Sequence, residues 1–155
     1  MRYLLLLFLF PVLLSAQKNR YAFFELGGSG GFGSFNFEKC FLQKGNIDFT
    51  FRSGISFTPI DRNNGVGIIF PLLVNMQVGN GSNKLEVGVG QGITITTKGN
   101  FFFLMPALIG WRYQKPDKRI FYRVSYTPLI SYLFDFQYQH FAGLSIGYTL
   151  KEKTK

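Results

Sequence analysis

Ala142-Gly-Leu-Ser-Ile-Gly-Tyr-Thr-Leu150, close to the C-terminus, alternates between apolar residues and small ones. Ala142, Leu144, Ile146, Tyr148 and Leu150 share one parity, and the residues between them are only Gly, Ser and Thr. A period of two residues is typical of a β-strand whose two faces meet different surroundings. This stretch therefore predicts a strand with one continuous apolar face and one face of small residues.

The same alternation recurs through the chain. No segment after Ala16 keeps apolar residues at helical spacing without interruption by Gly, Pro or β-branched residues. We predict an all-β domain of about eight antiparallel strands, each roughly ten residues long, which is the length that tilted strands need to cross a bilayer. The expected strands are Arg20–Gly28, Gly31–Phe41, Ile47–Phe57, Gly65–Val78, Lys84–Thr96, Asn100–Tyr113, Lys118–Ile130 and His140–Leu150.

The N-terminal segment differs from the rest of the chain. Arg2 supplies a positive charge, residues 4–14 form a nearly unbroken apolar run, and Ser15-Ala16 offers small residues for cleavage. A membrane anchor is the alternative, but the run is shorter than the roughly 20 residues of a spanning helix and contains Pro11. We predict a signal peptide over residues 1–16, cleaved near Ala16, and a single β-barrel domain over residues 17–155.

Composition narrows the class of protein. The chain has 19 Phe, 8 Tyr and 18 Gly, which suits strands and tight turns better than helices. Its single cysteine, Cys40, cannot form an internal disulfide, so other interactions must hold the fold. The net charge of +9 comes from Lys and Arg spread along the sequence, which argues against nucleic-acid binding.

The second face of the strands indicates which side meets lipid. A soluble sandwich would carry many Lys and Glu residues on its outer face. Here that face holds mostly Gly, Ser and Thr with a few charges of both signs, which suits the side-chain-filled interior of a small barrel. The fourth and sixth strands would also turn some apolar residues inward, giving a partly apolar interior: Ile69, Leu73, Phe102, Leu104 and Leu108.

Charged residues of inward parity are the candidate site. Buried charges are tolerated only when they are paired or hydrated, so we predict a salt-bridge network that plugs the lumen. A proton or ion path, or a site for a polar ligand, is the functional alternative. The predicted network consists of Glu25, Glu38, Arg52, Glu86, Arg112, Arg119 and Arg123, and Asp48 and Lys84 also point inward.

Aromatic residues near the strand ends predict the two interfacial belts of a membrane barrel. Ordinary core aromatics of a soluble protein are the alternative for any one of them. The candidates are Phe41, Phe57, Phe101, Trp111, Tyr113, Tyr122 and Tyr148.

On these features the chain resembles the small eight-stranded outer-membrane barrels of the OmpA/OmpX type. Gly143-Leu-Ser-Ile-Gly-Tyr148 looks like the Gly-x-x-apolar-x-aromatic signal read by the barrel-assembly machinery. It departs from that pattern in having Phe141 at a usually polar position and in continuing through residues 151–155. The resemblance implies a monomer in the outer membrane of a Gram-negative bacterium, in contact with its lipids, without a cofactor, and with roles from envelope integrity to adhesion.

The connections carry turn chemistry, including Gly27-Gly-Ser-Gly30 and Asp61-Arg-Asn-Asn-Gly65. With the N-terminus in the periplasm, the second, fourth and sixth connections become the short periplasmic turns. The first connection and the last, residues 131–139, then fall on the outer side.

Two other classes of function stay open. Some small outer-membrane barrels are lipid-modifying enzymes that pair a serine with a histidine, but His140 and Ser145 have opposite parity, and nothing in the spacing requires Ser125 or Ser131 to approach His140. We therefore predict no enzyme activity, and we find no cluster with metal-ligand spacing. The second class is a soluble, lipocalin-like barrel that binds an apolar ligand.

Overall fold

The chain folds into one closed barrel of eight antiparallel strands in sequence order. The computed structural model describes residues 19–131 and 137–150. The strands are β1 (Arg20–Gly27), β2 (Gly33–Lys44), β3 (Ile47–Asp61), β4 (Gly65–Val78), β5 (Asn83–Thr96), β6 (Phe101–Tyr113), β7 (Ile120–Ser131) and β8 (Gln137–Leu150), and a short 3₁₀ turn, η3 (Gly28–Gly30), follows β1. Within these residues no helix is long and apolar enough to span a membrane.

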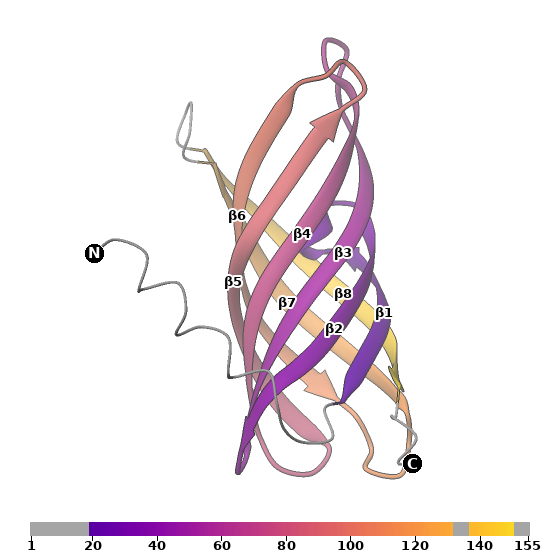
Figure 1. The fold of residues 1–155 in the computed structure, drawn as a ribbon, viewed down its shortest axis with the longest axis vertical. Coiled ribbons are helices and arrows are strands. Elements are labelled where there is room, and N and C mark those ends of the chain that lie inside the picture. The colour runs from indigo at the N-terminus through magenta and orange to yellow at the C-terminus, as the bar shows by residue number, and fades with distance from the viewer. Residues whose placement is uncertain (1–18, 132–136, 151–155) are drawn as a thin grey trace, which may run out of the picture.

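The barrel closes by pairing the first strand with the last. Arg20 lies opposite Leu150, and the ladder continues to Gly27 opposite Gly143. We call the end that carries Arg20 and Leu150 the lower end, as it is drawn in Figure 1, and the opposite end the upper end. At the upper end the hairpins β3–β4 and β5–β6 rise above β1 and β2 (Figure 1).

The predicted strands are confirmed in number, order and facing, and they differ at their ends. β2 starts two residues later than predicted and runs to Lys44, and β3 continues to Asp61. β8 starts at Gln137, so the predicted loop over residues 131–139 is shorter than expected. Hairpins extend as long as backbone hydrogen bonds can be paired, which side-chain alternation does not report.

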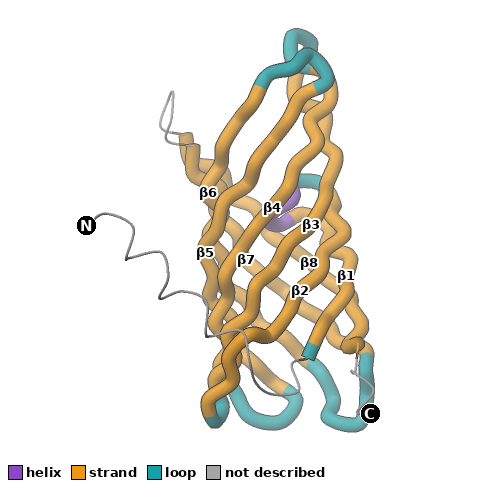
Figure 2. The backbone as a smooth tube through the Cα atoms, in the orientation of Figure 1, coloured by secondary structure: helices purple, strands orange, loops and turns teal. Residues whose placement is uncertain are grey.

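The first connection does not project from the barrel as the outer-side prediction expected. Gly28, Ser29 and Gly30 are buried, and Figure 2 shows this turn, in purple, within the outline of the barrel. Gly27, Gly28 and Gly31 adopt positive φ angles near 70–79°, which glycine reaches without steric cost. The glycines therefore allow residues 28–31 to turn inward and lie over the lumen. We call this segment the plug.

Side-chain facing follows the parity of the sequence. In β7 the residues alternate between buried and exposed from Phe121 to Thr127, and in β8 the buried residues from Gly143 to Thr149 are those of the small-residue face. Polar and charged side chains such as Glu25, Arg52 and Asn75 are fully buried. The core of this molecule is thus the lumen of the barrel.

Candidate functional site

The lower and middle lumen holds the predicted charges, which reach it from six different strands. Inward parity on each strand delivers one or two charged side chains to the same space, and the curvature of the barrel brings them together. Six of the seven predicted residues form ion pairs there: Glu25, Glu38, Arg52, Glu86, Arg112 and Arg123.

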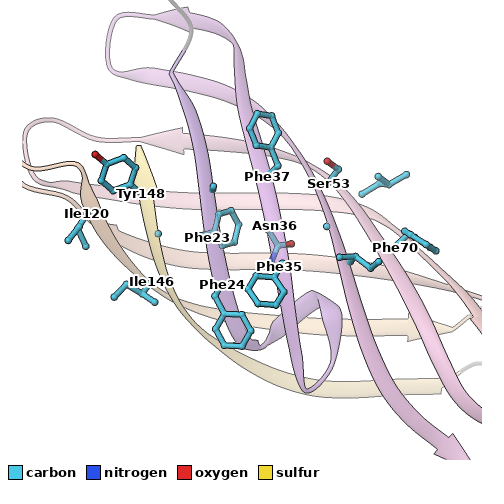
Figure 3. Close-up of a pocket in the computed structure, with 15 residues that line it drawn as sticks. Phe23, Phe24, Phe35, Asn36, Phe37, Ser53, Phe70, Ile120, Ile146 and Tyr148 are labelled. Atoms are coloured by element: carbon cyan, nitrogen blue, oxygen red, sulfur yellow. The ribbon is translucent and has the colours of Figure 1, made fainter. Parts of the chain in front are cut away.

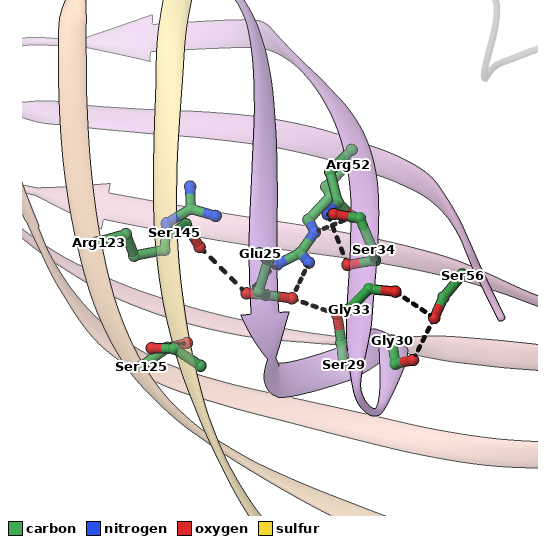
Figure 4. Close-up of polar contacts among 12 residues, drawn as sticks. Glu25, Ser29, Gly30, Gly33, Ser34, Arg52, Ser56, Arg123, Ser125 and Ser145 are labelled. Atoms are coloured by element: carbon green, nitrogen blue, oxygen red, sulfur yellow. Dashed lines mark hydrogen bonds and ion pairs between the residues drawn. The ribbon is translucent and has the colours of Figure 1, made fainter. Parts of the chain in front are cut away.

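Glu25 is the acceptor of the upper ion pair (Figure 4). Arg52 donates to both of its carboxylate oxygens, and the Nη1 to Oε1 distance is 3.3 Å. The Arg52 Nε atom donates to Asn36 Oδ1 at 2.9 Å, which fixes the orientation of the guanidinium. Hydroxyl groups of Ser29 and Ser145 lie 3.4 Å from the same carboxylate. This pair ties β1, β2, β3, β8 and the plug together.

Glu38 and Glu86 form the lower ion cluster with Arg112 and Arg123. Arg123 lies between the two carboxylates, with Nη2 at 2.8 Å from Glu38 Oε2 and Nε at 2.6 Å from Glu86 Oε2. Arg112 Nη1 is 3.2 Å from Glu38 and 3.6 Å from Glu86. Gln77 completes the cluster by donating to Glu38 Oε1 at 2.6 Å. All five side chains are almost completely buried.

Three inward aromatic rings cover the guanidinium groups. Arg112 lies 3.9 Å from the ring centroid of Tyr21 and 3.7 Å from that of Phe121. Arg123 lies 4.6 Å from the ring of Phe23. A cation over an aromatic face gains electrostatic attraction, most strongly where water is excluded. The rings therefore compensate part of the cost of burying these charges.

Our sequence reasoning did not select these rings or the amides of Asn36 and Gln77. They share the inward parity of the charged residues, but the predicted network includes charged side chains only. The signal that could have found them is the parity of Tyr21 and Phe23, which they share with Glu25 on the first strand.

Arg119 lies outside the network, so its predicted place was wrong. β7 begins only at Ile120, and the exposed Arg119 donates to the hydroxyl of Tyr148 at 3.0 Å. The turn that follows β6 runs on to this residue, which frees its side chain from strand parity. Lys84 and Asp48 form a separate ion pair near the lower mouth, where the Lys84 side chain is partly exposed.

The charges of the buried network balance. Three carboxylates and three guanidiniums meet with a zero formal sum. No group of three His, Cys, Asp or Glu side chains in the part of the chain that the structure describes could hold a metal ion. The arrangement can fill and cross-link the lumen, and it presents no activated nucleophile.

His140 lies on the outer wall with two tyrosines. Its Nδ1 atom is 2.5 Å from the hydroxyl of Tyr126, whose hydroxyl is 3.0 Å from that of Tyr138. Ser125 and Ser145 are buried in the lumen, on the other face of the sheet. His140 therefore lies on the opposite face of the sheet from Ser125 and Ser145.

The outer wall is apolar, and it contains a shallow groove across β8, β1, β2, β3 and β4 (Figure 3). Its lining includes the small residues Ala22 and Ser53. The rings of Phe24 and Phe35 stand beside it with their centroids 5.0 Å apart. The wall thus presents hydrocarbon surface even where it is hollowed.

Comparison with known proteins gives a fold and no family. No protein-family model and no curated protein matches the sequence. The structure is similar to the crystal structure of the N-terminal beta-barrel domain of Pseudomonas aeruginosa OprF, with a TM-score of 0.59 over 86% of this chain and 97% of that domain. The chain has the OmpA-like barrel fold. Because the sequence identity between the two chains is 13%, this similarity establishes the fold and nothing about function.

Proposed function

We propose that the protein is an integral outer-membrane β-barrel with a structural or surface-interaction role and a lumen closed by side chains. The observation that carries this proposal is the inverted polarity of the barrel: charged side chains are buried and large apolar side chains are exposed.

The numbers at single positions illustrate the inversion. Leu85 is 66% exposed and Ile109 is 62% exposed, whereas Arg52 and Glu86 are 0% exposed. In water, exposed apolar surface on this scale would drive association. In a bilayer the same wall is solvated by acyl chains, and backbone groups are satisfied by the closed ladder.

Aromatic residues support the membrane position. Trp111, Tyr113, Tyr122 and Tyr148 lie toward the lower end of their strands, and Phe57 and Phe101 lie toward the upper end. Rings of this kind are favoured at the two membrane–water interfaces. Signal-peptide cleavage near Ala16 falls outside the described residues and stays part of the proposal, as do insertion by the barrel-assembly machinery and contact with outer-membrane lipids.

The soluble lipocalin-like alternative requires the opposite arrangement. A carrier of an apolar ligand needs an apolar inner wall throughout and a polar outer surface. The ion pairs of the lower lumen and the exposed apolar wall both disfavour it.

A structural role is favoured over conduction because the ion clusters cross the lumen. Arg123, Glu38 and Arg112 come from three strands and meet inside the barrel, and small barrels are filled by their side chains. The plug closes the lumen above them.

Cell fractionation combined with gel migration tests the proposal. Cells that express the full chain are separated into periplasm, inner membrane and outer membrane, and the extracted protein is run with and without boiling. We expect outer-membrane fractionation and a band that shifts on boiling. Recovery as a soluble periplasmic protein would overturn the proposal and favour the lipocalin-like alternative.

A further inference from the structure

The upper lumen contains a cavity of a different character from the ion-paired region below. Its volume is about 510 Å³, and it lies between the tall strands β3–β6 on one side and the upper part of the hairpin β7–β8 on the other. The plug forms its floor through Ser29 and Gly31. The volume is within the range of about 300–1,000 Å³ that is typical of small-molecule sites.

The cavity is lined by apolar side chains and by neutral polar groups. None of its described lining residues is charged. Phe32, which follows the plug, also lines the cavity and is 66% exposed. The apolar lining comes mainly from inward-facing side chains of five strands: Ile60, Ile69, Phe102, Leu104, Leu129 and Phe141.

Hydroxyl and amide groups are interspersed among the apolar side chains of the lining. Thr58, Ser131 and Gln139 line the cavity from β3, β7 and β8. They can donate to or accept from a neutral polar head, such as a hydroxyl or ester. A charged head would be desolvated without an ionic partner, which strongly disfavours its binding.

The seam between β6 and β7 connects the cavity with the outer wall. Pairing runs from Met105–Ile130 to Pro106–Leu129 and then stops until Ile109–Tyr126. Pro106 and Pro128, which border this gap, have no backbone N–H to donate across it. Phe103, whose neighbours Phe102 and Leu104 face inward, also lines the cavity. Phe103 has the outward parity of β6 and lies above Met105–Ile130, the uppermost pair of this ladder, so the cavity reaches the membrane-facing wall at the upper end of the seam.

We propose that the upper cavity binds the hydrocarbon chain of a neutral, single-chain lipid, which enters from the membrane along the β6–β7 seam. The apolar lining solvates the chain, and the hydroxyl and amide groups take the uncharged head. This inference rests on the proposed membrane location, because the lipid reaches the seam from the bilayer.

Photolabelling in vesicles tests the site. The full barrel is inserted into phosphatidylcholine vesicles that contain a monoacylglycerol with a diazirine in its chain, and labelled residues are identified by mass spectrometry after irradiation. We expect labelling of the buried, cavity-lining Ile69 and Leu129 in addition to outer-wall residues such as Val87. Thr58→Trp, which fills the cavity, is expected to reduce the inward labelling severalfold, whereas the outer-wall control Val87→Trp leaves it unchanged.

The outcomes separate this inference from the proposed function. Labelling of the outer wall without inward labelling, or inward labelling unchanged by Thr58→Trp, overturns the lipid site and leaves the membrane barrel standing. A protein that fails to insert and takes no label on either face overturns both. If Thr58→Trp loses its heat-dependent gel shift, Ser131→Trp serves as the blocking variant, with the same expected loss.

Discussion

The lower and the upper lumen share most of their strands and are filled in opposite ways. Below, Arg112 and Arg123 meet carboxylates within 2.6 to 3.6 Å, and aromatic rings cover them. Above, the lining is apolar and encloses about 510 Å³ of space. This difference shows that the number of strands in a barrel does not determine how its lumen is filled. The inward residue at each level decides whether that level is closed or hollow.

The largest difference between the two regions is expected for loss of a buried charge. Arg123→Leu removes the cation between Glu38 and Glu86, and breaking a buried ion pair typically costs about 3–5 kcal/mol. We expect a loss of that size in the free energy of unfolding, measured by urea titration in vesicles. Arg119→Leu is the matched control, because its side chain is exposed, and should change stability by less than about 0.5 kcal/mol. Equal losses in the two variants would contradict a network that stabilises the lumen.

Substitutions of glycine by alanine test whether the lower lumen is packed more tightly than the upper lumen. A Cβ at Gly147 would lie 2.4 Å from ring atoms of Phe121, whereas a Cβ at Gly92 would first meet Leu104 at 3.5 Å. We expect Gly147→Ala to destabilise the barrel by about 1–3 kcal/mol through overpacking. Gly92→Ala, at the upper level, should be neutral or slightly stabilising, since alanine restricts the unfolded chain. The same urea titration measures both variants, and a costly Gly92→Ala would show that the upper lumen is also tightly packed.

The plug is the boundary between the two regions, and one hydroxyl anchors it. Ser56 Oγ donates to the carbonyl of Gly30 or of Gly33, at 2.5 and 2.6 Å. Ser56→Ala leaves these carbonyls without that donor, and we expect a loss of about 1–2 kcal/mol. Amide hydrogen exchange of residues 28–33 should accelerate at the same time. Ser53→Ala on the outer wall is the control and should leave exchange in the plug unchanged.

The smallest effect is expected at the lower mouth. Lys84 pairs with Asp48, but its side chain is 27% exposed. Partly solvated ion pairs contribute up to about 1 kcal/mol and are screened by salt. Lys84→Met should therefore lower stability slightly at low ionic strength and hardly at all in high salt. A loss that persists in high salt would indicate that this pair belongs to the buried network.

The sequence predicted which face of each strand points inward, because alternation is a local property. Glu25, Arg52 and Arg123 were placed in the lumen on parity alone. Parity does not say which acid meets which base: Arg123 pairs with Glu38 from a strand that is not its neighbour, and that meeting depends on the stagger of the closed barrel. The inward turn after β1 was also missed, since Gly-rich connections look alike whether they project or fold back.

The plug also bears on the order in which the barrel is completed. Ser29 sits beside Glu25 on β1, and the same carboxylate is approached by Ser145 on β8. Ser29 and Glu25 are close in sequence, but Ser145 reaches this carboxylate only when the two terminal strands meet, across the seam that ends at Gly27 and Gly143. The hydrogen bonds around Glu25 are therefore completed only when the last strand pairs with the first, so this part of the lumen is filled as the ring closes.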